Sequence, residues 1–77
     1  MNYVIKTAEK GNVLIIFEQN GNEYIVYETV LKHGIVRKEV FDKYDFAETW
    51  FNARCVANGI TEIEEVEHDL AEFANID

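Results

Sequence analysis

Apolar residues recur in short runs through the first 41 residues, and runs of this length between turn residues predict strands. Four runs are rich in β-branched and aromatic residues and are bounded by turn residues: 3–7, 13–18, 23–31 and 35–41. Asn20-Gly21 is the strongest hairpin signal, because both residues tolerate the positive φ angles of a type I′ turn. Connections this short cannot cross over between parallel strands, so we expect an antiparallel meander over about residues 3–41.

The second half of the chain has apolar residues at helical spacing, which predicts helices over about 46–58 and 62–75. Each predicted helix begins with a pair of residues in capping-box spacing: Asp45 with Glu48, and Thr61 with Glu64. Asn58-Gly59 is expected to cap the first helix at its C-terminal end. The expected fold class is therefore α+β, a four-stranded antiparallel β-meander packed against two C-terminal α-helices in a single domain, 1–77.

Both faces of the predicted sheet are apolar in the middle. Ile15 and Phe17 point to one face, whereas Leu14 and Ile16 point to the other. Helices on one side of a sheet cover one face, and the uncovered face should then carry polar residues. Either the helices and the sheet twist cover more than this, or the second face is an interface with a second copy or a partner.

Acidic residues are concentrated at the C-terminal end of the chain. Residues 55–77 contain seven acids and no Lys or Arg, while eight acids and seven bases in residues 1–54 nearly cancel, for a net charge of −8. This charge disfavours direct contact with a phosphate backbone and favours a basic protein surface, including one that normally binds nucleic acid. We therefore expect a protein partner and no direct nucleic-acid ligand.

Four carboxylates follow one stripe of the second predicted helix: Glu62, Glu65, Asp69 and Glu72. A row of charges at steps of three and four residues can imitate backbone phosphates, so we interpret the stripe as a partner-binding surface. The alternative is that these acids only keep the helix soluble. Tyr24 and Tyr27 are predicted as further interface residues, because Tyr is enriched at protein interfaces.

No catalytic motif is present, and we predict neither an enzyme nor a cofactor. Cys55 matches no nucleophile motif and is expected to be a small residue of the core. Glu64, His68 and Glu72 are four residues apart, but transition-metal sites usually draw on a second His or Cys, so no metal is predicted.

One cysteine cannot form an internal disulfide, and no apolar run approaches the roughly 18 residues of a membrane span. No targeting segment is recognisable at the N-terminus. We expect a cytoplasmic protein with no membrane contact.

The run EQNGNEYIVY at 18–27, a second hairpin and the run AETWF at 47–51 together resemble the layout of small phage-encoded anti-CRISPR proteins. Those are short chains with an antiparallel sheet, an Asn-Gly-type hairpin and packed helices, and the resemblance covers residues 13–73. It implies an inhibitor that binds a CRISPR effector and blocks nucleic-acid binding, with acidic residues in a basic groove. The alternative prediction is a homodimeric or scaffold domain that makes its contact through the open sheet face around Tyr24 and Val26.

Overall fold

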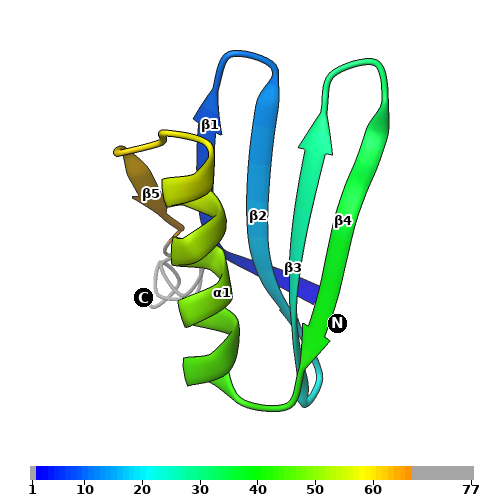
Figure 1. Ribbon diagram of the computed structural model, residues 1–77. Coiled ribbons are helices and arrows are strands. Elements are labelled where there is room, and N and C mark those ends of the chain that lie inside the picture. Colours follow the sequence, from blue (N-terminus) through cyan, green and yellow to red (C-terminus); the bar gives the residue numbers. More distant parts are fainter. Residues whose placement is uncertain (1, 67–77) are drawn as a thin grey trace, which may run out of the picture.

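In the computed structural model the described part of the chain, residues 2–66, forms one antiparallel sheet with one helix packed on it (Figure 1). The elements in chain order are β1 (Asn2–Lys10), β2 (Val13–Asn20), β3 (Glu23–Val30), β4 (Gly34–Phe41), α1 (Tyr44–Ala57) and β5 (Ile63–Glu65).

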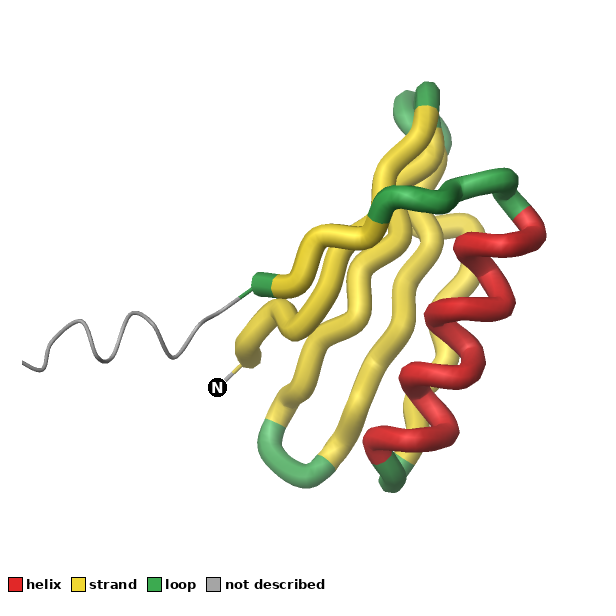
Figure 2. Tube along the Cα trace, turned by 90° about the vertical axis from the view of Figure 1, so that its left-hand side faces the viewer, coloured by secondary structure: helices red, strands yellow, loops and turns green. Residues whose placement is uncertain are grey.

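The sheet has the order β4-β3-β2-β1-β5, and all its pairs are antiparallel. After β4 the chain crosses one face of the sheet as α1 and returns at the opposite edge as β5 (Figure 2). Within residues 2–66 the outer strands of the sheet are therefore β4 and β5. The single helix of residues 2–66, α1, falls short of the length and apolarity needed to cross a bilayer.

The four predicted strands, their antiparallel pairing and the first helix are confirmed, and the α+β class holds, but the sheet has five strands where four were predicted. The second helix is wrong at its start, because residues 63–65 form β5 against β1; the rest of it lies outside the described residues. Residues 61–66 carry apolar side chains at Ile63 and Val66, a spacing that suits a helix, but the run Glu62-Ile63-Glu64 also alternates as a strand does. The outer edge of β1 offers backbone hydrogen bonds to this segment, and pairing with that edge selects the strand over the helix.

The hydrophobic core lies between α1 and the sheet. Ile15 and Phe17 of β2, Val26 of β3 and Phe51 of α1 are almost fully buried there. Phe17 and Phe51 have ring centroids 5.8 Å apart, which couples the centre of the sheet to the middle of the helix.

The ends of α1 differ in how they are capped. The prediction that Asp45 caps the N-terminus of the helix is wrong, because the N-cap residue is Lys43 and Asp45 lies in the first turn. The Lys43 side chain makes no capping hydrogen bond. At the C-terminal end Gly59 has φ 68°, and the Ile60 amide donates to the Cys55 carbonyl at 2.9 Å. These are the features of a Schellman cap, so the Asn58-Gly59 stop is confirmed.

The face of the sheet opposite α1 is only partly covered. The register of β1 shifts between Val4 and Lys6, and the start of β1 then runs behind the sheet (Figure 1). On this face Ile25 is buried at 6% exposure and Glu18 at 9%. The two apolar faces are thus explained by the helix on one side and, in part, by the first strand on the other.

Candidate functional site

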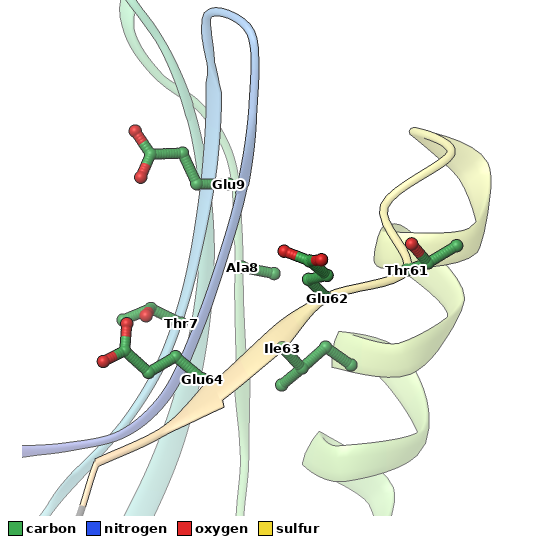
Figure 3. A pocket seen from close by; sticks show the side chains of 7 residues that line it. All are labelled: Thr7, Ala8, Glu9, Thr61, Glu62, Ile63 and Glu64. Atoms are coloured by element: carbon green, nitrogen blue, oxygen red, sulfur yellow. The ribbon is translucent and has the colours of Figure 1, made fainter.

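The β5 edge is where the charge of the described chain is most one-sided. Antiparallel pairing sets Glu64 opposite Thr7 and Ile63 opposite Ala8, and the Val66 amide donates to the Ile5 carbonyl at 2.9 Å. Because side chains alternate along a strand, Ile63 and Glu64 point to opposite faces. Figure 3 shows Ile63 directed toward α1 and Glu64 directed away from it.

Glu9 of β1 points to the same side as Glu64, and Glu62 lies between the strand and the end of α1 (Figure 3). We call these three carboxylates, Glu9, Glu62 and Glu64, the acidic edge. They surround an open hollow of about 620 Å³, which is also lined by Thr7, Ala8, Thr61 and Ile63. The acidic edge therefore borders a surface depression that a partner's side chain could enter.

Among residues 2–66, no ion pair neutralises the acidic edge. The two lysines of β1 are engaged elsewhere. Lys6 Nζ lies 2.8 Å from Glu48 Oε2 of α1, and Lys10 Nζ donates to the Gly59 carbonyl at 2.9 Å. The hydrogen bond to Glu48 raises the pKa of Lys6, which stays protonated and bound to the helix.

Glu62 and Glu65, two of the four carboxylates in the predicted stripe, do not share a surface in this fold. Glu62 belongs to the acidic edge, but Glu65 points to the other side, where its Oε2 lies 3.9 Å from Lys6 Nζ. A strand separates these two residues because their spacing of three places them on opposite faces. Asp69 and Glu72 lie outside the described residues.

Tyr24 and Tyr27 point to opposite faces of β3, so they do not form one contact surface. Tyr24 is on the α1 side, with its ring centroid 5.7 Å from that of Tyr44. Tyr27 is on the open face, and its hydroxyl donates to Glu18 Oε2 at 3.0 Å. Burial, together with the Glu18 carboxylate, raises the pKa of Tyr27.

Glu28 is a buried carboxylate of the kind that could act as an acid or base. It is 5% exposed and points toward α1. Its oxygens accept bonds from Arg54 Nε at 2.7 Å and Asn58 Nδ2 at 3.0 Å, and Arg37 Nε lies 3.3 Å away. The bond from Arg54 holds the pKa of Glu28 below its usual range. Its partners make it a structural link between the sheet and the helix.

Cys55 lies in the core at 2% exposure, as expected, and burial raises the pKa of its thiol, which disfavours the reactive thiolate. Within residues 2–66 no group of three or more His, Cys, Asp or Glu side chains could hold a metal ion. Of the three residues weighed as metal ligands, Glu64 lies in β5, and His68 and Glu72 lie outside the described residues.

Sequence reasoning missed Glu9 as a member of the site. No local signal marks it, because it joins Glu62 and Glu64 only through the pairing of β5 with β1, more than 50 residues apart in the chain. Comparison with protein-family models, curated proteins and solved structures found no match to this chain.

Proposed function

We propose that this chain is a non-enzymatic binding protein whose acidic edge docks on a basic surface of a partner protein. The observation that carries the proposal is that Glu9, Glu62 and Glu64 line one hollow and that no ion pair with a base among residues 2–66 neutralises them. Like charges gathered in this way repel one another, and a basic partner would relieve that repulsion.

The sequence adjoining the acidic edge supports the same role. Beyond Val66 it contains Glu67, Asp69, Glu72 and Asp77 and no Lys or Arg. Acids that served only solubility would be expected among Lys and Arg of opposite sign. A local excess of one sign instead favours long-range attraction to a surface of the opposite sign.

The partner class that fits this charge is a nucleic-acid-binding protein, because a phosphate-binding surface is basic. Occupying that surface would block nucleic-acid binding, and a CRISPR effector is the instance that the anti-CRISPR resemblance implies. Such docking should weaken as salt rises, because both charged surfaces are exposed.

The test is capture of partners from a cell lysate on the immobilised protein, followed by mass spectrometry. The variant changes Glu9, Glu62 and Glu64 to Gln, which removes three charges and keeps side-chain size. A matched control, Glu23→Gln/Asp42→Asn/Asp45→Asn, removes three exposed charges away from the acidic edge. The wild type and the control should retain the same basic protein, nucleic acid should displace it, and the variant should lose it. Equal capture by all three proteins would contradict the proposal.

The alternative of a dimer formed through Tyr24 and Val26 is not favoured by the fold. Val26 is 1% exposed beneath α1, and Tyr24 packs edge-to-face against Tyr44. Val26 is therefore closed to a second molecule, and Tyr24 is half-buried against the helix, so the two residues do not offer an open contact surface.

A further inference from the structure

Two asparagines of this chain are followed directly by glycine, and their surroundings in the fold differ. Asn20-Gly21 lies at the tip of the β2–β3 hairpin, and Asn58-Gly59 lies at the C-terminal end of α1. An asparagine before glycine is prone to lose its side-chain amide, because glycine has no Cβ to keep its backbone nitrogen away from that side chain. The contacts around each pair therefore decide which asparagine is open to this reaction.

Asn58-Gly59 is held at both of the groups that would react. The side-chain nitrogen of Asn58, Nδ2, donates to Glu28 Oε2 at 3.0 Å and to the Arg54 carbonyl at 2.8 Å. The Gly59 amide donates to the Val56 carbonyl at 3.0 Å. Turning the Gly59 nitrogen onto the Asn58 side chain would break these bonds and take one donor from the buried Glu28 carboxylate.

Asn20-Gly21 lacks these restraints. Both residues are exposed, and a Cβ added to Gly21 would meet no atom within 4 Å. Among residues 2–66 no partner bonds the Asn20 side chain or accepts from the Gly21 amide. Gln19 Nε2 does donate to the Gly21 carbonyl at 3.0 Å, but that oxygen takes no part in the reaction.

The turn itself opens at little cost. Gly21 has a φ of 65° and Asn22 does not have a positive φ, which are the features of a two-residue type II′ turn with glycine first. Asn20 and Glu23 form the last pair of the hairpin before the turn. Loss of this one exposed pair frees Asn20 to rotate, and openings of this kind at loop tips are among the cheapest in a folded protein.

We propose that Asn20 is a site of spontaneous deamidation and that the fold protects Asn58 from the same reaction. The backbone nitrogen of Gly21 attacks the side-chain carbonyl carbon of Asn20, and the new carbon–nitrogen bond closes a succinimide ring. The bond from that carbon to Nδ2 breaks, and ammonia leaves with the proton that the Gly21 amide loses. Water then opens the ring at either of its two carbonyl carbons. One opening gives aspartate, and the other gives isoaspartate, in which the main chain runs through the side-chain carbons.

Either product should weaken the β2–β3 hairpin. A carboxylate at position 20 lies opposite Glu23, and like charges directly across a strand pair are destabilising. Isoaspartate also lengthens the main chain beside a turn whose length sets the register of the two strands. Asn20 pairs with Asn2 on its other side, so the loosening would extend to the start of β1.

Timed incubation of the folded protein at mildly alkaline pH, followed by proteolysis and mass spectrometry, measures both asparagines in one sample. Exchange of the amide NH₂ for OH identifies each product, and isoaspartyl methyltransferase labels the isoaspartate. We expect Asn20 to convert about tenfold faster than Asn58, or more, because only Asn58 has to break several contacts first. In urea those contacts are absent, so the two asparagines should convert at similar rates.

Two variants separate the chemistry from its effect on the hairpin. Asn20→Gln should abolish fast conversion at position 20 and leave the rate at Asn58 unchanged. Asn20→Asp carries the charge of the product without the lengthened main chain. In thermal unfolding, the isolated isoaspartate form should unfold at a lower temperature than Asn20→Asp, and Asn20→Asp at a lower temperature than wild type.

Equal conversion of the two asparagines in the folded protein would overturn the proposal, as would a folded protein in which neither converts over the time that suffices in urea. A rate difference that persists unchanged in urea would assign the preference to neighbouring residues and would overturn the role given to the fold. None of these outcomes bears on docking through the acidic edge, because the test changes none of its three carboxylates.

Discussion

The two edges of the sheet differ in length, charge and origin. The β5 edge has three residues and borders three carboxylates. It joins the sheet only after α1 has carried the chain across one face of the sheet. The β4 edge has eight residues, exposes three apolar side chains and carries Arg37 and Lys38. Both edges have features that resist pairing with a further strand: β5 is short and bordered by acids, and β4 carries Arg37, Lys38 and Glu39 and a register shift opposite Glu28 and Thr29. One sheet thus has an acidic edge at one side and an edge with more bases than acids at the other.

The helix is joined to each half of the sheet by a different ionic contact. On the β3–β4 side, Glu28 is held by Arg54 and Asn58. On the β1–β5 side, Lys6 is held by Glu48. The pKa of Glu28 is lowered, which makes the first contact sensitive to acid, and the pKa of Lys6 is raised, which makes the second sensitive to alkali.

The largest expected effect comes from Glu28→Ala. The change leaves Arg54 without its buried partner, and we expect the free energy of unfolding to fall by about 2 to 4 kcal/mol. Chemical denaturation monitored by circular dichroism measures the loss. Arg37→Ala is the control, because Arg37 contacts the same carboxylate but its side chain is 52% exposed, and it should cost no more than about 1 kcal/mol.

The pH dependence of this contact follows from the lowered pKa of Glu28. Its stabilisation is fully present above the unfolded-state value of roughly 4.3 and is lost as pH falls through the lower folded-state pKa. Wild type should therefore lose more stability than Glu28→Ala between pH 5 and strongly acidic pH. Parallel acid curves for the two proteins would contradict this assignment.

A smaller effect is expected for Lys6→Ala on the β5 side. Glu48 loses its partner but is about one-third exposed, so water compensates part of the loss and the cost should be about 1 to 2 kcal/mol. The pKa of Lys6 is raised, so its stabilisation is present below the unfolded-state value of roughly 10.4 and is lost as pH rises through the folded-state value. The variant's deficit should shrink at alkaline pH, and a deficit that grows there would oppose the mechanism.

The smallest expected effect is that of removing the acidic edge. Changing Glu9, Glu62 and Glu64 to Gln relieves like-charge repulsion and should raise the free energy of unfolding by a few tenths of a kcal/mol at low salt. Added salt should erase the gain, because these side chains are exposed. Thermal unfolding at two ionic strengths measures the difference. A clear loss of stability would mean that these carboxylates support the fold, and it would remove the reason to treat them as a binding surface.

The sheet faces show where sequence reasoning succeeded and where it stopped. Ile15 and Phe17 point to one face and Leu14 and Ile16 to the other, and this run of apolar residues correctly predicted a strand with two apolar faces. It did not reveal that α1 covers one face and the start of β1 part of the other, because a register shift between Val4 and Lys6 redirects that strand. Glu28 lies two residues from Val26 and so points to the same buried face of β3. A buried acid needs a basic partner, and this position could have predicted one on the helix.

Local sequence by itself determined the four hairpin-linked strands, the first helix and its Gly59 stop, because these depend on side-chain period and turn chemistry within a few residues. Only the tertiary structure decided the fate of residues 61–66. Their pattern suits either a helix or a strand, and the open edge of β1 selected the strand. That choice separated Glu62 from Glu65 and brought Glu62 and Glu64 beside Glu9, since neighbours across a sheet are set by strand pairing and not by distance along the chain.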